Sequence, residues 1–123
     1  MSMETPSWIQ ELFSSIDAMD VDTFASFLTE DAQFKFGNAP PATGKEAIKK
    51  AVGGFFSTLH GLKHALLNTW SHSGSIIVQG EVTYTRKDAS TVTLPFVNVF
   101  GMQGNLIEDY LIYMDINPLF QQK

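Results

Sequence analysis

The stretch SIIVQGEVTYTRKDASTVTLPFVNVFGM, residues 75–102, decides the fold of this chain. It holds two runs rich in Val, Ile, Thr and aromatic residues, which are the residue types that favour strands. Only Asp88-Ala89-Ser90 separates the two runs. A gap this short joins antiparallel neighbours, because a parallel crossover needs a dozen or more residues. The stretch therefore predicts a hairpin of two long strands.

Two further runs of the same character flank this hairpin. LKHALLNTWS, residues 62–71, comes before it, and NLIEDYLIYMDI, residues 105–116, comes after it. The gaps His72-Ser73-Gly74 and Gln103-Gly104-Asn105 are again short turn sequences. The second half of the chain therefore predicts a four-stranded antiparallel meander.

The first half has mostly helical periodicity. Apolar residues recur at helical spacing in residues 5–20, where Thr5 or Ser7 could cap the helix, and again in residues 21–28 and 45–61. AQFKFG, residues 32–37, alternates as a strand does. The sequence thus predicts an α+β fold in which three N-terminal helices pack on a curved, mostly antiparallel sheet.

Length and composition favour one globular domain over residues 1–123. The chain is 44% hydrophobic and 17% charged, with a net charge of −5 and no cysteine. A negative chain without a basic cluster argues against nucleic acid as a partner, and no apolar run is long enough to span a membrane. We found no signal-peptide pattern in MSMETPSWIQELF, so the expected location is cytoplasmic.

Several segments carry a resemblance to a known superfamily. DVDTFASFLTEDAQF, ATGKEAI, GEVTYTR, LPFVNVF and LIEDYLIYMD, taken in order, resemble the SnoaL-like and ketosteroid-isomerase-like proteins, also called nuclear-transport-factor-2-like or cystatin-like. The resemblance extends from about Trp8 to Phe120. It implies a cone with an apolar cavity, and often a homodimer formed through the sheet. The superfamily includes isomerases, cyclases, dehydratases, epoxide hydrolases and proteins without known catalysis.

The residues that the resemblance carries over are few. The general base of the isomerases falls on Phe36, which cannot take a proton, and their first-helix Tyr falls near Leu12 or Phe13. Their second oxyanion donor falls on Asn98, whose amide can donate a hydrogen bond. The Arg and Asp of the epoxide hydrolases are missing near residues 81–83.

Asp115 is the position that best matches an acid of the superfamily, at the end of the last long strand. A regular strand would put it on one face with Leu111 and Tyr113, inside the cavity, where burial would raise its pKa and suit it to acid or base chemistry. DINP, residues 115–118, is also a turn sequence, in which Asp115 would cap the turn. The sequence leaves both readings open.

Asn98 and His64 are the other two candidates for catalysis. Asn98 shares its strand face with Phe96 and Phe100, and it is either a cavity donor or a structural amide. His64 shares parity with Trp70, and it is either an acid or base in the cavity or a half-exposed residue.

The remaining candidates are ligand-binding residues. Tyr84 and Tyr113 could donate a hydroxyl to a ligand or simply fill the core. The expected aromatic walls are Trp8, Phe36, Phe56, Trp70 and Phe100. No metal site is expected, because Gly61 separates His60 from His64 and breaks helical spacing, and no cofactor is needed.

These residues lead to one functional hypothesis with two alternatives. The chain is expected to bind a hydrophobic cyclic small molecule and, as an enzyme, to act by proton transfer as an isomerase, cyclase or dehydratase. In this hypothesis Asp115 is the acid or base, Asn98 polarises a carbonyl, and His64 or Tyr84 assists. The alternatives are a non-catalytic ligand-binding module and a protein-interaction module of the same fold.

Overall fold

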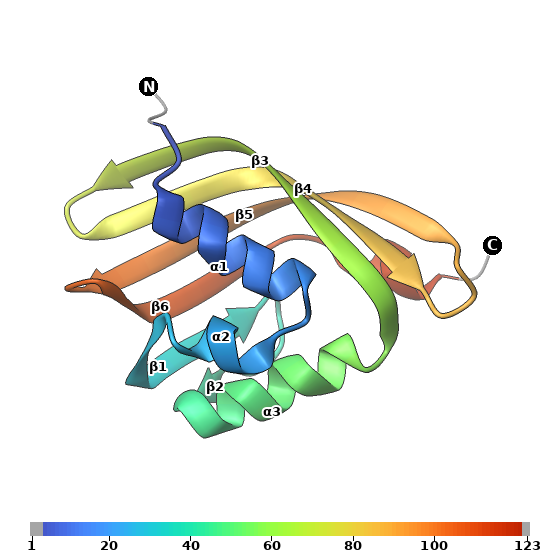
Figure 1. The fold of residues 1–123 in the computed structure, drawn as a ribbon, viewed down its shortest axis with the longest axis horizontal. Coiled ribbons are helices and arrows are strands. Elements are labelled where there is room, and N and C mark those ends of the chain that lie inside the picture. The colour runs from blue at the N-terminus through green and yellow to red at the C-terminus, as the bar shows by residue number, and fades with distance from the viewer. Residues whose placement is uncertain (1–3, 122–123) are drawn as a thin grey trace.

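The computed structural model describes residues 4–121, and its elements follow the predicted order (Figure 1). The helices are α1 (Ser7–Asp17), α2 (Val21–Ala25), α3 (Lys45–Phe56) and the 3-10 helix η1 (Asn117–Phe120). The strands are β1 (Leu28–Phe36), β2 (Ala42–Thr43), β3 (Leu59–His72), β4 (Ser75–Arg86), β5 (Thr91–Gln103) and β6 (Leu106–Tyr113). The predicted α+β class is confirmed.

All six strands form one mixed sheet in the order β2-β1-β6-β5-β4-β3. Strands β3 to β6 are the predicted antiparallel meander, and β1 joins it by pairing in parallel with β6. The two-residue strand β2 was not predicted, because it lies in the proline-containing loop. Its residues pair with Gln33 and Phe34 of β1.

The three turns of the meander need unusual backbone angles, as their sequences suggested. Ser73 and Gly74 have φ of 51° and 82°, Ala89 has 74° and Gly104 has 62°. Positive φ in short hairpin loops matches the twist of the flanking strands. The turn chemistry therefore sets the register of the long strands.

A β-bulge interrupts the pairing of β3 with β4. The register shifts between Leu66 and Asn68, opposite Gly80, which pairs with Leu66. A Cβ atom on Gly80 would run into the carbonyl oxygen of Ala65. Glycine at this position thus lets the two backbones approach closely, and the bulge changes which face the later residues of β3 present.

The helices are shorter than the sequence predicted, and α1 begins differently. Pro6 precedes α1 without a side-chain cap, so the prediction that Thr5 or Ser7 caps it is wrong. The hydroxyl of Thr5 instead lies 2.7 Å from that of Thr69 in β3, which ties the start of α1 to the sheet. Helix α2 has a cap that was not predicted: Asp20 accepts a hydrogen bond from the Thr23 N–H at 3.1 Å.

The core lies between the helices and one face of the sheet (Figure 1). Helix α1 buries Ile9, Leu12, Phe13 and Ile16 there, and α3 buries Ile48, Val52 and Phe56. An aromatic cluster continues the core across β5 and β6, where the rings of Phe100 and Tyr110 lie 4.7 Å apart. One layer of helices on one sheet face therefore encloses the interior.

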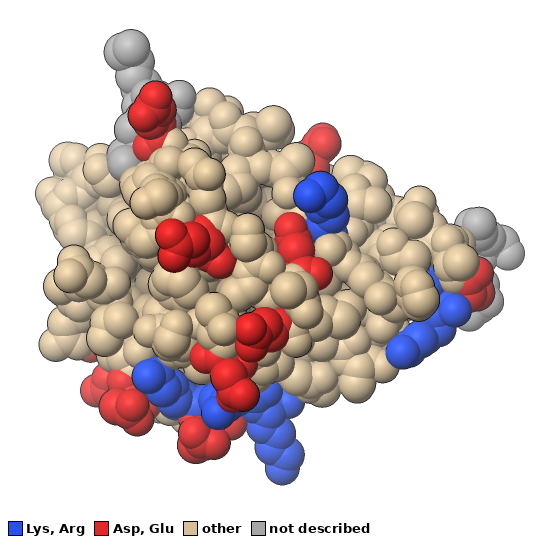
Figure 2. All heavy atoms as spheres, viewed as in Figure 1, with Lys and Arg blue, Asp and Glu red and all other residues tan. Residues whose placement is uncertain are grey.

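Acidic and basic side chains are interspersed on the face shown in Figure 2. Lys49 pairs with Asp22 at 2.9 Å, linking α3 to α2, and Lys45 pairs with Glu30 at 3.4 Å. The hydrogen bond and charge of Asp22 raise the pKa of Lys49. Within residues 4–121, no helix is long and apolar enough to cross a membrane.

Candidate functional site

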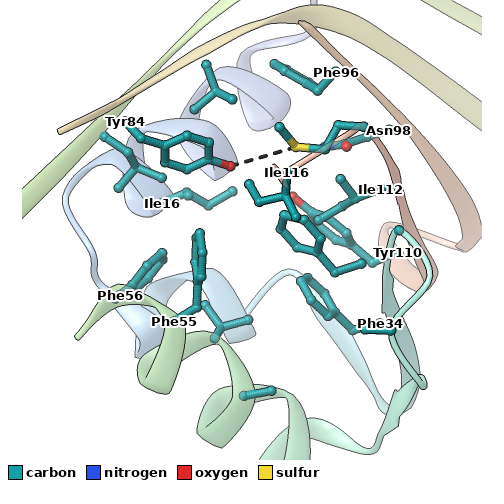
Figure 3. A pocket seen from close by; sticks show the side chains of 18 of the residues that line it. Ile16, Phe34, Phe55, Phe56, Tyr84, Phe96, Asn98, Tyr110, Ile112 and Ile116 are labelled. Carbon is teal, nitrogen blue, oxygen red and sulfur yellow. Dashed lines mark hydrogen bonds between the residues drawn. The ribbon is translucent and has the colours of Figure 1, made fainter. Parts of the chain in front are cut away.

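A cavity of about 760 Å³ lies between the helices and the inner face of the sheet. Strands β1, β3, β4, β5 and β6 all contribute walls, and helices α1, α2 and α3 close the other side (Figure 3). No Lys or Arg of residues 4–121 lines it. The lining is mainly apolar and rich in aromatic rings, namely Phe24, Phe34, Phe36, Phe55, Phe56, Tyr84, Phe96, Tyr110 and Phe120.

His64 lines this cavity and is held by a carboxylate from another element. Its Nδ1 lies 2.6 Å from Oδ1 of Asp17, the last residue of α1. The same carboxylate accepts the backbone N–H of His64, at 3.0 Å to Oδ2 and 3.2 Å to Oδ1. Strand β3 is an edge strand of the sheet, so the N–H groups on its outer side have no strand partner, and that of His64 bonds Asp17 instead.

This pairing fixes the tautomer of His64. A carboxylate can only accept, so Nδ1 carries the hydrogen and Nε2 of the neutral ring keeps its lone pair. The rings of Phe13 and Phe96, whose centroids lie 4.9 and 5.3 Å away, hold the imidazole from two sides. The His64 side chain is only 10% exposed, so the expectation of a half-exposed histidine does not describe it.

Asn98 is buried in the cavity wall on β5, with 3% of its surface exposed. Its neighbours across the sheet are Val78 and Ile112, both apolar. Among residues 4–121, no group donates a hydrogen bond to its Oδ1. A purely structural amide would be bonded to nearby backbone, because an unpartnered buried carbonyl oxygen costs free energy of folding. The Oδ1 atom of Asn98 therefore keeps a capacity to accept a hydrogen bond that no described residue meets.

Tyr84 enters the cavity from β4 and is almost completely buried. Its hydroxyl points at the sulfur of Met114, 3.8 Å away, which is the dashed contact in Figure 3. A thioether is a weak acceptor. Burial raises the pKa of Tyr84 well above its ordinary value of 10.0, so the hydroxyl stays protonated and able to donate.

Asp115 lies at the mouth of the cavity, outside any strand. Strand β6 ends at Tyr113, and the exposed carboxylate of Asp115 accepts a hydrogen bond from the Asn117 N–H at 3.0 Å. Asp115 thus caps the turn that begins η1 and also lines the cavity at its mouth, so each of the two readings left open by the sequence holds in part. The expectation that it shares an inward face with Leu111 and Tyr113 is wrong.

The face assignment of β6 fails for a simple reason. Tyr110 and Ile112 line the cavity, so the alternate residues point away from it, and Tyr113 is 57% exposed on the outer face. The apolar run from Tyr110 to Met114 concealed the alternation, because both faces of the strand carry large apolar side chains. Tyr113 is therefore not a cavity residue.

The other expected wall residues divide into two groups. Phe36 and Phe56 line the cavity, as predicted. Phe100 is fully buried in the core against Tyr110 but does not reach the cavity. Trp8 packs near Phe27, with ring centroids 6.3 Å apart, also away from the cavity.

Trp70 is displaced by the bulge in β3. The sequence put it on the face of His64 by simple alternation, but the register shift between Leu66 and Asn68 reverses the faces beyond that point. Thr69 is consequently the residue buried inward, and Trp70 does not line the cavity. One extra residue in a strand is enough to invert such a prediction.

Asp17 is the site residue that sequence reasoning missed. It lies one turn after Phe13, so it extends the inward apolar stripe of α1 with an acid. An acid on such a stripe was a usable signal. Its partner, however, follows 47 positions later in the chain, so the pairing itself had no local signature.

Comparisons with known proteins agree with the fold. The family model described as SnoaL-like domain matches residues 9–110. No curated protein matches the chain in sequence. A solved NTF2-like protein of unknown function from Burkholderia pseudomallei is 13% identical over 92% of each chain, with a TM-score of 0.83.

Two further solved structures share this fold. An LEH-like epoxide hydrolase from M. tuberculosis is 12% identical, covers 91% of this chain and 83% of its own, and has a TM-score of 0.76. TerC, co-crystallized with polyporic acid, is 18% identical over 92% of each chain, with a TM-score of 0.80. At these identities the likeness concerns the fold alone. The family match covers most of the chain, and we conclude that this protein belongs to the SnoaL-like domain family.

Proposed function

We propose that this SnoaL-like protein binds an apolar, cyclic small molecule in its cavity and catalyses proton transfer on it. Isomerisation, cyclisation and dehydration are the reactions that such a step serves. The observation that carries the proposal is the pair formed by Asp17 and His64, joined at 2.6 Å beside a cavity lined by aromatic rings.

In this mechanism His64 is the acid or base and Asp17 is a positioning residue. Asp17 holds the Nδ1–H, so Nε2 is the nitrogen that takes a proton from a carbon next to a carbonyl and later returns it. The carboxylate also stabilises the imidazolium formed in between. Asp115, the acid or base of the initial hypothesis, lies exposed at the mouth and is replaced in this role by His64.

The apolar walls support the choice of substrate. Burial of a ring system against aromatic side chains stabilises binding in proportion to the apolar area removed from water. The co-crystallization of TerC with polyporic acid is consistent with organic ligands in this fold. Tyr84 and Asn98 are the polar groups available to orient a ligand oxygen.

Exchange of carbon-bound hydrogen tests the chemistry without knowledge of the natural product. The ketone 2-tetralone is incubated in D₂O, and loss of its α-proton signals is followed by NMR. The wild-type protein should accelerate this exchange over buffer, and His64→Gln should abolish the acceleration. Equal acceleration by wild type and His64→Gln, both folded, would show that His64 is not the base.

A second candidate is ligand binding without catalysis. The observation that favours it is Phe36, which lines the cavity where the isomerase resemblance expects the base. Under this alternative, 2-tetralone binds in calorimetry but its exchange stays at the buffer rate for every variant. Binding with enhanced exchange would exclude it.

A homodimer through the outer face of the sheet is proposed as the partner arrangement. Tyr113 on the outer face of β6 is 57% exposed, and Leu67 at the bulge of the edge strand β3 is 55% exposed. These large apolar side chains are surface that a second copy of the chain could cover. Sedimentation should show a dimer, and Tyr113→Glu should shift it towards monomer. A strict monomer for the wild-type chain at high concentration would rule this out.

A further inference from the structure

The hydroxyl of Tyr84 is a buried hydrogen-bond donor with a poor acceptor. Tyr84 is 3% exposed, and within residues 4–121 its hydroxyl donates only to the sulfur of Met114, 3.8 Å away (Figure 3). A thioether accepts a hydrogen bond weakly, so the hydroxyl recovers little of the bonding to water that it loses on burial. Burial also raises the pKa of Tyr84, so the proton stays on the hydroxyl at physiological pH.

Met114 lies where a small oxidant can reach its sulfur. It lines the cavity directly before the exposed residue Asp115, and it is only partly buried. Residues 4–121 hold two other methionines, Met19 and Met102, which are also partly buried but do not line the cavity. Of these three, Met114 is the one whose sulfur faces a hydroxyl donor. Both its access and its surroundings therefore set Met114 apart.

The distance between the two side chains suits one additional oxygen atom. A hydrogen bond between two oxygens spans about 2.7 Å. The gap of 3.8 Å between the Tyr84 hydroxyl and the Met114 sulfur exceeds this length by less than one sulfur–oxygen bond. An oxygen bound to the sulfur therefore reaches the hydroxyl at a bent angle, and neither side chain has to move. The hydroxyl hydrogen already points at a sulfur lone pair, and sulfur takes up oxygen at a lone pair.

We propose that Met114 is a site of oxidation by hydroperoxides and that Tyr84 binds the resulting sulfoxide. The sulfur lone pair forms a bond to one oxygen of the peroxide while the O–O bond breaks, and the proton of the transferred oxygen passes to the departing one. Sulfur loses two electrons, and the peroxide is reduced to water, or to water's organic counterpart, an alcohol. The sulfoxide oxygen then accepts the hydrogen bond of Tyr84.

Tyr84 allows the fold to tolerate this oxidation. A methionine sulfoxide is polar, and in apolar surroundings it ordinarily disrupts packing. Here the donor is already in place, so oxidation replaces a weak O–H···S contact with a stronger O–H···O hydrogen bond. The new bond joins β4 to the segment between β6 and η1 at the cavity mouth. Oxidation should thus hold the mouth more firmly and leave the rest of the fold intact.

Treatment with hydrogen peroxide tests this site without any ligand. Mass spectrometry of peptides measures the oxygen gained by each methionine, and Tm is measured before and after treatment. The same treatment of Met114→Leu gives the contribution of the other methionines, which is subtracted. We expect Met114 to gain one oxygen in the folded wild-type protein. The corrected Tm should stay unchanged or rise by a few degrees.

Tyr84→Phe removes the donor and keeps the ring. Oxidation of Met114 should then lower Tm by a few degrees, because the sulfoxide oxygen has lost the Tyr84 donor in an apolar wall. Tyr113→Phe removes the hydroxyl of an exposed tyrosine and is the matched control, so it should respond to peroxide as the wild type does. A difference between these two variants assigns the effect to the Tyr84 hydroxyl.

Two results would overturn the proposal. One is that Met114 stays unoxidised in the folded wild type under conditions that oxidise free methionine. The other is that oxidation of Met114 changes Tm equally in the wild type and in Tyr84→Phe. Neither result depends on the proposed catalysis, and His64→Gln should respond to peroxide as the wild type does.

Discussion

The carboxylate of Asp17 accepts hydrogen bonds from both the backbone N–H and the ring Nδ1 of His64, 47 positions further along the chain. The first bond fixes the position of the strand edge relative to α1, and the second fixes the orientation of the ring. The two bonds together leave the imidazole little freedom in a cavity that is otherwise lined by apolar groups.

Asp17→Asn tests whether this relationship serves catalysis. The amide oxygen can still accept hydrogen bonds, so the fold should persist, but the negative charge that stabilises the imidazolium is lost. We expect exchange of the 2-tetralone α-protons to slow by at least about tenfold. Glu11→Gln removes an exposed acid from the same helix and is the matched control. Equal rates for Asp17→Asn and Glu11→Gln would reduce Asp17 to a structural role.

Asn98→Leu should raise the thermal stability of the free protein. It replaces an amide whose buried Oδ1 has no partner in the described part of the chain with an apolar side chain of similar size. The gain should be on the order of 1 kcal/mol, seen as a rise of a few degrees in Tm. Asn68→Leu is the control, because Asn68 bonds Oε1 of Gln79 at 2.7 Å and its loss should not stabilise the protein. A lower Tm for Asn98→Leu would mean that the amide is structural.

Gly80→Ala should destabilise the sheet at the bulge. Its Cβ would meet the carbonyl oxygen of Ala65, and two paired backbones cannot separate without losing hydrogen bonds. Urea unfolding should show a loss of about 1–3 kcal/mol. Gly54→Ala is the opposite case, since among the described residues nothing beyond its own neighbours and the local backbone of α3 lies within 4 Å of the added Cβ, and it should stabilise α3 by up to about 1 kcal/mol. Unchanged stability in Gly80→Ala would contradict the close approach.

Arg86 should control the order of the segment that closes one end of the cavity. Its Nε and Nη2 each donate at 2.9 Å, to the carbonyl oxygens of Leu119 and Pro118 in η1. Arg86→Lys keeps the charge but cannot span both carbonyls. Hydrogen exchange at the Leu119 amide should accelerate in Arg86→Lys and not in Lys87→Ala, whose side chain is on the exposed turn. Similar protection in both variants would show that packing alone holds η1.

The two buried tyrosines predict a loss of stability at alkaline pH. Burial raises the pKa of Tyr84 and of Tyr110 above the ordinary 10.0 that both would have in the unfolded chain. The folded state therefore keeps protons that the unfolded state releases, so this contribution is complete below pH 10 and declines as the pH rises above it. Each tyrosine should remove up to about 1.4 kcal/mol per pH unit in that range.

Urea unfolding between pH 8 and pH 11 measures this loss. Tyr84→Phe should make the decline less steep, because the hydroxyl that resists ionisation is gone. Tyr113→Phe changes an exposed tyrosine and should leave the decline as it is in the wild type. A decline that is the same in all three proteins would have another origin.

The architecture was largely readable from the sequence because its signals are local. Turn residues at positions 72–74, 88–90 and 103–105 separate strands of alternating residues, and each neighbour in the meander is also the next strand in the chain. The parallel pairing of β1 with β6 and the short strand β2 have no such local signal, and β2 was missed. The predicted helices also extended too far at their C-terminal ends, since α1 ends at Asp17, α2 at Ala25 and α3 at Phe56.

The sequence predicted the candidate site only in part, because contacts between distant segments have no local signal. His64, Asn98, Tyr84, Phe36 and Phe56 were recognised as unusual or aromatic residues on strands or helices, and they do line the cavity. Trp70 and Tyr113 were assigned to the wrong face, since alternation fails at a bulge and is hidden in a strand that is apolar on both faces. Asp115 was predicted to end the last strand, but β6 ends at Tyr113, so Asp115 lies in the turn that follows.

The sequence by itself determined the class of the fold, the meander and the apolar character of the interior, because residue periodicity and turn chemistry act over a few neighbouring positions. Only the tertiary structure decided that Asp17 meets His64, that Oδ1 of Asn98 has no donor within residues 4–121, and that Asp115 caps a turn at the mouth. Those facts depend on how α1 crosses the edge of the sheet and on where one bulge shifts the register. Such long-range geometry is set by the packing of the whole chain, and no short segment encodes it.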